Sequence, residues 1–219
     1  MGDEKERSND PAVGPGGPDA RDQAEGKAPS FEVPPILQLG DPRELMDRLI
    51  EEDPFELRSR CSRCSRARAV ILSPERLVLQ TMARVAVKAG GFAGEEPFGE
   101  WLERIVKDCI EDLLDEQREE ERRGLPVADS PDSAFYAALA EVLECPVCDA
   151  RMACVSLNSM SDAHREAFHA VIVQGNSLEE WARKCGVPQK RVRALLREVG
   201  QEVGMRLEKR SRARRRRPL

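Results

Sequence analysis

The chain has 219 residues, of which 34% are charged and only 4% are aromatic, so its length and composition suit two small, polar, helix-rich domains better than one large core. Its net charge of −5 hides a strong segregation, because the part from residue 178 onward carries 14 Lys/Arg against 5 Asp/Glu. This segregation indicates that the C-terminal part meets an anionic partner.

No apolar run is long enough to span a bilayer, and the charged N-terminus has no apolar core, so neither membrane insertion nor a secretory signal is expected. Seven cysteines in such a chain favour a reducing cytosol, with free thiols or metal ligands, over disulfides. We therefore expect a cytoplasmic protein.

The predicted elements are all helices, because apolar residues recur with helical spacing and nowhere alternate with a period of two. In chain order the predicted helices cover 43–50, 55–72, 74–89, 98–122, 133–143 and 163–173, followed by two short helices between 177 and 199. The fold class is therefore predicted to be all-α.

Composition also divides the chain into segments. Residues 1–30 are rich in Gly, Pro and charged residues and nearly free of large apolar side chains, so they are predicted to be disordered. Gly, Pro and Asp mark 123–132 as a linker between a first helical domain at 42–122 and a second at 133–207. The basic segment 208–219 is predicted to be a disordered tail.

The stretch 177–199 has the features of a helix–turn–helix. Ser177 and Glu180 have the spacing of a capping box, in which each side chain bonds the backbone N–H of the other. Gly186 suits the left-handed conformation that ends a helix, and Pro188 suits the start of the next one. The apolar stripe of the first helix consists of Leu178, Trp181, Ala182 and Cys185.

The second helix of this pair is expected to have an apolar and a basic face. The residues with inward spacing are Val192, Leu195, Leu196, Val199 and Val203. The candidate DNA-binding residues, on the opposite face and at the leading end, are Gln189, Lys190, Arg191, Arg193 and Arg197. A short cationic helix of this kind suits the major groove and its flanking phosphates. An ordinary helical hairpin with a solvated basic face produces the same pattern.

Two stretches, 74–112 and 157–196, carry a wider pattern. The matching residues of the first are Thr81, Arg84, Val85, Phe92, Pro97, Phe98, Trp101, Leu102, Arg104, Ile105 and Asp112. Those of the second are Leu157, Arg165, Phe168, Gly175, Ser177, Glu180, Ala182, Gly186, Val187 and Val192. With these residues in this order and separation, the chain resembles the extracytoplasmic-function sigma factors of bacterial RNA polymerase, in their second and fourth conserved regions.

The resemblance implies a helical bundle like sigma region 2 and a helix–turn–helix domain like sigma region 4. The bundle would bind core RNA polymerase and help to open the minus-ten element of promoter DNA, and the second domain would bind the minus-thirty-five element. The implied contact residues are Arg76, Leu77, Thr81 and Arg84 for polymerase, with Arg104 and Lys107 for the DNA backbone. An anti-sigma factor would be a further partner, and no catalytic residue is implied.

The chain also departs from the family pattern. Residues 76–79 replace the usual Asp-Leu-Val-Gln of the polymerase-binding helix, which inverts one charge and removes one amide. Asp108 and Asp115 replace an Asn and an Arg, and in the DNA-binding helix Leu195 and Glu198 each replace an Arg. Partly desolvated carboxylates repel phosphate by about 1 kcal/mol each. We therefore expect the fold to tolerate these changes and promoter opening to be weakened.

A structural zinc site is a separate interpretation, although no cofactor is required. Cys61 and Cys64 fall on the apolar stripe of a predicted helix, where cysteine acts as a small hydrophobe. The Pro-containing turn at 145–148 is expected to be non-helical and suits a metal better. The candidate zinc ligands are Cys145, Cys148, Cys154 and His164. A redox-sensing cysteine pair is the alternative.

Three functions follow from these patterns. The first is a sigma factor that directs promoter-specific transcription initiation. The second is a sigma-derived helix–turn–helix regulator that binds DNA without opening promoters. The third is a metal- or redox-responsive interaction protein. The sequence contains no nucleophile–base pair or phosphate-binding loop, so an enzyme is not expected.

Overall fold

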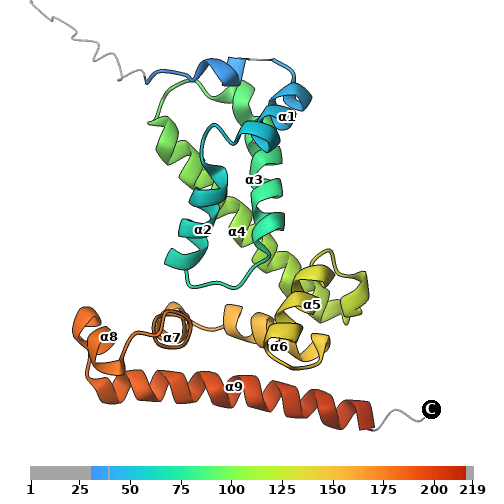
Figure 1. Cartoon of the computed structure of the whole chain (residues 1–219), viewed down its shortest axis with the longest axis vertical. Helices are drawn as coiled ribbons and strands as arrows, with labels where there is room; N and C mark the ends of the chain where they lie inside the picture. Colours follow the sequence, from blue (N-terminus) through green and yellow to red (C-terminus); the bar gives the residue numbers. More distant parts are fainter. Residues whose placement is uncertain (1–30, 39, 216–219) are drawn as a thin grey trace, which may run out of the picture.

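The computed structural model describes residues 31–38 and 40–215, with side chains as far as Lys209. Within these residues the chain is helical and contains no strand, which confirms the all-α fold class (Figure 1). The helices are α1 (Pro42–Glu52), α2 (Leu57–Ala67), α3 (Pro74–Lys88), α4 (Phe98–Arg123), α5 (Ser133–Val142), α6 (Val147–Asn158), α7 (Asp162–Phe168), α8 (Leu178–Cys185) and α9 (Gln189–Arg215). The predicted disordered segment 1–30 lies outside the described residues.

Local sequence signals explain most helix starts. Proline occupies the first position of α1 and of α3, and Asp41 and Ser73 accept backbone N–H bonds as their caps. Helix α4 ends at Gly124, whose φ of 65° is left-handed. The cap of α7 is Ser161, so the helix begins at Asp162, one residue before the predicted start at 163.

Helices α1 to α4 form the first bundle, at the top of Figure 1. Its buried cluster includes Leu49, Leu57, Met82, Leu102 and Ile105, which belong to all four helices. Four aromatic rings close one end of the bundle with centroids 4.7–5.5 Å apart, and these rings are Phe55, Phe92, Phe98 and Trp101. Burial of this apolar surface holds the bundle together.

The second half of the chain lies below the bundle as a layer of helices, with the long α9 along its lower edge (Figure 1). A π-helical turn, His169–Val173, links α7 to the loop before α8. A second hydrophobic cluster joins α7, this turn, α8 and the start of α9 through Ala167, Ala170, Trp181 and Val192. Helices α5 and α6 pack against each other, and α6 contacts both α4 and α9.

The prediction that helix 55–72 continues to Leu72 is wrong, because α2 ends at Ala67. Ala69 takes a left-handed φ of 51°, and the chain then continues without helical structure. The Asn158 side chain accepts a bond from the backbone N–H of Ile71 at 2.9 Å and donates to its carbonyl at 2.8 Å. Asn158 belongs to α6. The backbone N–H and C=O of Ile71 are therefore satisfied by a residue of the second half and not by a continued helix.

The segment 123–132, predicted as a linker, is packed against the bundle. Its Ser130 and Asp132 are buried, and the Asp132 carboxylate pairs with Arg76 of α3 at 2.9 Å. The Ser130 hydroxyl donates to Glu120 at the end of α4, at 2.8 Å. The segment therefore joins the two halves through buried contacts with α3 and α4.

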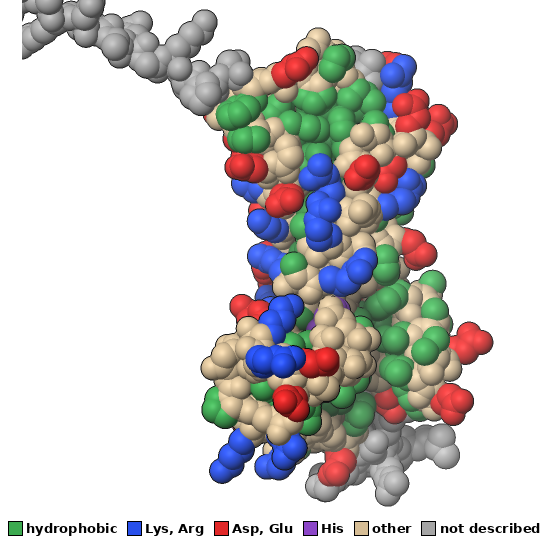
Figure 2. All heavy atoms as spheres, turned by 60° about the vertical axis from the view of Figure 1, so that its left-hand side comes forward, with side chains coloured by type: hydrophobic (Ala, Val, Ile, Leu, Met, Phe, Trp, Pro, Cys, Tyr) green, Lys and Arg blue, Asp and Glu red, His purple; other side chains and the backbone are tan. Residues whose placement is uncertain are grey.

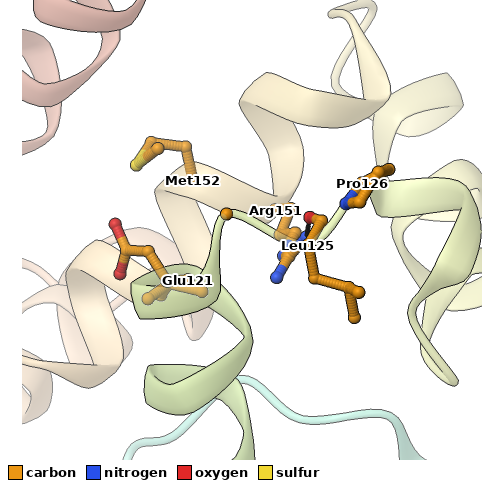
Figure 3. A pocket seen from close by; sticks show the side chains of 7 residues that line it. Glu121, Leu125, Pro126, Arg151 and Met152 are labelled. Carbon is orange, nitrogen blue, oxygen red and sulfur yellow. Dashed lines mark hydrogen bonds between the residues drawn. The ribbon is translucent and has the colours of Figure 1, made fainter.

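Arg151 of α6 binds both the segment 123–132 and the end of α4. Its guanidinium donates to the carbonyl of Leu125 at 2.6 Å and pairs with Glu120 at 3.3 Å. Figure 3 shows Arg151 beside Leu125, at a pocket of about 350 Å³ that Glu121 and Met152 also line. An almost fully buried arginine needs such partners, since an unpaired buried charge is costly.

Two further segments differ from expectation. The turn at 145–148 was predicted to be non-helical, but α6 begins at Val147, so Cys148 is on the helix and only Cys145 precedes it. The tail was predicted to be disordered from residue 208, whereas α9 runs to Arg215. No described helix is both long and apolar enough to cross a membrane.

Candidate nucleic-acid interface

The predicted helix–turn–helix is present in α8 and α9. Ser177 accepts the backbone N–H of Glu180 at 3.1 Å, and the Glu180 carboxylate accepts that of Ser177 at 2.9 Å, which completes the capping box. The hydrogen bond from the Ser177 backbone N–H to the Glu180 carboxylate lowers the pKa of Glu180. Gly186 ends α8 with a φ of 66°, and its N–H bonds the carbonyls of Ala182 and Arg183. The turn that orients α9 is thus specified by local chemistry.

Packing fixes the angle of this helix pair. Trp181 of α8 is 8% exposed, and Val192 and Leu195 of α9 are 0% and 3% exposed. All three belong to one hydrophobic cluster with Ala167 and Ala170. Leu195 is therefore a core residue of this domain.

The five candidate DNA-binding residues of α9 are all exposed. Neither Lys190 nor Arg197 has an ion-pair partner among the described residues. Arg193 donates to the side chain of Gln189 at 3.4 Å, and Arg191 lies 3.8 Å from Glu198. Because most of these cations are not neutralised by carboxylates, they remain available for phosphate or base edges.

Helix α8 adds cations that the sequence prediction omitted. Arg183 and Lys184 are exposed in its last turn, beside the helix–turn–helix turn. Their signal was present in the sequence, because both lie off the apolar stripe of α8. They extend the basic surface from α9 to the preceding helix.

Glu198 of α9 makes contacts within the protein. Its carboxylate lies 2.7 Å from Nε2 of His164, which comes from α7. The other ring nitrogen of His164, Nδ1, lies 2.7 Å from the Ser161 hydroxyl. Glu198 thus links α9 to α7 at a position where an arginine would extend the basic face.

The two candidate DNA-contacting residues of α4 lie in the first bundle, apart from the helix–turn–helix. Arg104 is paired with Glu96, while Lys107 is exposed and has no ion pair among the described residues. Helix α4 contains ten acidic and five basic residues. Its surface is therefore less favourable for phosphate than that of α9.

The predicted polymerase-binding residues of α3 are largely occupied inside the protein. Leu77 and Thr81 are 1% and 0% exposed, so they are core residues in this structure. Arg76 pairs with Glu116 and Asp132, and Arg84 pairs with Asp112. Leu77 and Thr81 are therefore closed to a partner, and Arg76 and Arg84 are partly exposed but already paired.

The solvent face of α3 instead carries an apolar stripe. Leu79 is 51% exposed and Val87 is 74% exposed, and the exposed Ala83 lies between them at the same helical spacing of four residues. This row of exposed apolar side chains is a candidate protein-binding surface. The sequence prediction missed this stripe because α3 is apolar on several faces.

The cysteines are mainly core residues. Burial raises the pKa of Cys61 to about 11 and that of Cys154 to about 12, so both thiols are protonated at neutral pH. The Cys61 thiol also lies 3.5 Å from the Thr81 hydroxyl. Among the described residues, no three or more His, Cys, Asp or Glu side chains gather as metal ligands. Zinc binding by Cys145, Cys148, Cys154 and His164 stays a prediction.

Thiol labelling of the folded chain is expected to proceed in distinct phases. Cys185 is exposed and should react first, whereas Cys61 and Cys154 should react only on unfolding, because thiolate is the nucleophile and burial suppresses it. The measurement is the time course of a coloured disulfide reagent with and without denaturant. Cys185→Ser should remove the fast phase, and rapid labelling of Cys61 or Cys154 in the folded chain would instead support the redox-responsive alternative.

No model of a known protein family matches this sequence, and no curated protein matches it either. The capped helix pair, its exposed cations and the apolar stripe of α3 are the observations that support a function.

Proposed function

We propose that this protein is a DNA-binding transcription initiation factor of the sigma type. Helix α9 binds duplex DNA, and helix α3 binds core RNA polymerase. The observation that carries the proposal is the set of exposed cations on the capped helix pair, which have almost no carboxylate partners. Exposed cations without carboxylate partners are what binding to an anionic duplex requires.

The start of α9 has the geometry to enter the major groove. Lys190, Arg193 and Arg197 are separated by three and four residues, so they share one side of the helix. The opposite side is buried through Val192 and Leu195, which keeps the basic side outward. Arginine and lysine donate to guanine edges and to phosphates, so this side provides both specificity and affinity.

The apolar stripe of α3 supports the polymerase part of the proposal. Leu79, Ala83 and Val87 lie on the helix that resembles the polymerase-binding helix of sigma factors, and they are exposed while Leu77 and Thr81 are buried. Interfaces need a desolvated apolar centre, which this stripe provides. Leu79 of this stripe stands where the family usually has Gln, so an apolar contact would take the place of an amide contact.

A sigma-derived regulator is the second candidate, and the acidic surface of α4 favours it. Glu96 neutralises Arg104, and Asp108 and Asp115 add carboxylates along the same helix. Carboxylates oppose the contacts with strand backbone that promoter opening needs. Duplex binding without polymerase-dependent initiation in a reconstituted assay would select this candidate.

Replacing Arg193 or Arg197 with Ala is expected to weaken duplex binding by about 1–3 kcal/mol for a base contact, or to lower the salt slope by about 1 for a phosphate contact. Fluorescence anisotropy against a duplex selected from a random library, at several salt concentrations, measures both quantities. Arg118→Ala is the control, because Arg118 is an exposed arginine of α4 paired with Asp115. Unchanged affinity and salt dependence in both variants would show that α9 does not face the groove.

A further inference from the structure

Helix α2 is the second strongly basic element among the described residues, and it lies outside both stretches that resemble sigma factors. The segment 57–68 contains five arginines and no acidic residue. Its buried side consists of Leu57, Cys61 and Cys64, which pack in the bundle core. The arginines are therefore concentrated on the remaining sides of a helix that the sigma-like function does not use.

The end of α2 is fixed against the helix–turn–helix half. Arg165 of α7 donates from Nε to the carbonyl of Arg68 at 3.3 Å. Arg66 and His169 line one pocket of about 400 Å³. Burial, together with the nearby Arg66 charge, lowers the pKa of His169. The end of α2 therefore lies against α7 and the turn that follows it.

This position places α2 on the same side of the molecule as α8. Both helices lie toward the left of Figure 1, with α2 above α7 and α8. Figure 2 looks onto this side and shows basic side chains following one another from the bundle onto the helices below. The exposed Arg63 and Arg66 of α2 and Arg183 and Lys184 of α8 are among the cations of these helices.

The exposed arginines Arg63 and Arg66 of α2 make only weak contacts within the protein. Arg66 donates to the Ser62 hydroxyl at 2.7 Å and has no carboxylate partner among the described residues. Arg63 lies 3.8 Å from Glu103, and both side chains of that pair are largely exposed. Exposed pairs contribute little, so a phosphate can replace the carboxylate.

We propose that the outward side of α2 is a second phosphate-binding surface, on which Arg63 and Arg66 bind the backbone of the same duplex that α9 holds. This inference rests on the proposed DNA binding by α9. The contacts are to phosphate and carry no base specificity, so they increase affinity for any sequence that flanks the α9 site.

Duplex DNA fits this surface better than an acidic protein does. The exposed residues of α2 are Arg58, Ser59, Ser62, Arg63, Arg66 and Ala67, which include no large apolar side chain. Specific protein interfaces need an apolar centre, whereas a phosphate backbone needs only cations and hydroxyl donors. The two serines between the arginines supply such donors.

The length of α2 determines how much duplex it can contact. Its 11 residues span about 16 Å, which equals about five base pairs of duplex, so a flank of about ten base pairs covers it. The α9 site, defined by selection from a random duplex library, is extended by such a flank on one end or on the other. Only one of the two extensions is expected to increase affinity, because α2 lies to one side of α9.

The test compares the full chain with Arg63→Gln/Arg66→Gln in anisotropy titrations against these duplexes over a range of salt. Each lost phosphate contact should reduce the salt slope by about 0.9, so the double variant should lose about 1.8 and Arg66→Gln alone about half of that. The double variant should also lose the gain from the productive flank. Circular dichroism melting verifies that each variant is folded.

The matched control is Arg43→Gln/Arg48→Gln, which removes the same charge from α1. Both residues are exposed, and α1 lies at the upper right of the bundle in Figure 1, away from α2 at its lower left. This control should keep the wild-type slope and the flank effect. A general effect of net charge would instead change both double variants equally and would overturn the proposal.

Different results would contradict this inference and the proposed function. If Arg193→Ala weakens binding while the α2 variants and both flanks have no effect, α9 binds DNA and α2 does not. That result would overturn the proposal for α2 and leave the proposed function standing. If Arg193→Ala and Arg197→Ala also have no effect, the DNA-binding function itself is wrong.

Discussion

A chain carrying Leu79→Glu and Val87→Glu is expected to lose binding to core RNA polymerase while keeping its fold and its affinity for duplex DNA. Both side chains are exposed on α3, so the substitutions create no cavity in the bundle. At an interface each would bury an unpaired carboxylate in place of an apolar contact, which should weaken binding about 30-fold or more. Pull-down of purified core polymerase, with titration of the unbound fraction, measures this loss.

Val142→Glu/Leu143→Glu is the matched control for this experiment. These two residues are also exposed and apolar, at 79% and 53%, but they lie at the end of α5, away from the α3 stripe. The control should bind polymerase like the wild type. Equal binding of polymerase by both double variants would show that α3 is not part of the interface with polymerase. Absence of polymerase binding by the unmodified chain would rule out the sigma-type function and leave the DNA-binding regulator.

Asn158→Ala is expected to destabilise the chain by about 3 kcal/mol, because each unsatisfied buried polar group costs about 1–3 kcal/mol. Asn158 is 4% exposed and bonds both backbone groups of Ile71. It also donates to the side-chain oxygen of Gln117 at 2.9 Å. The side-chain nitrogen of Gln117 in turn donates to the Tyr136 hydroxyl at 3.0 Å. The substitution breaks this chain of bonds at its centre, where the two halves meet.

Urea unfolding followed by far-UV circular dichroism measures the change in free energy of unfolding. Asn176→Ala is the control, since the Asn176 side chain bonds only Gln174 within an exposed loop, and it should change stability by less than about 0.5 kcal/mol. A loss below about 1 kcal/mol in Asn158→Ala would mean that water replaces Asn158 at little cost. The two halves would then not depend on this contact for their arrangement.

Much of the fold was predictable from local chemistry. Ser73-Pro74 marks the start of α3, Gly124 follows the end of α4, and the capping box of Ser177 with Glu180 defines the start of α8. These signals act within one or two turns, so they need no knowledge of the rest of the chain. The exposed basic side of α9 was also predictable, because helical spacing separates Lys190, Arg193 and Arg197 from Val192 and Leu195.

The roles of α3 and α6 were not predictable in this way. Helix α3 is apolar on several sides, and only its orientation in the bundle buries Leu77 and leaves Leu79 and Val87 exposed. The Pro-containing start of α6 resembled a metal-binding turn, yet the helix continues through Cys154, which is buried. In both cases the deciding contacts come from residues distant in the sequence.

The sequence by itself therefore determined the helical class, most of the helix starts and the basic surface of the helix–turn–helix, because each depends on neighbouring residues. Only the tertiary structure decided where α2 ends, how 123–132 packs and how the two halves meet. The reason is physical: the backbone of Ile71 and the carboxylate of Asp132 need partners, and those partners, Asn158 and Arg76, are far away along the chain.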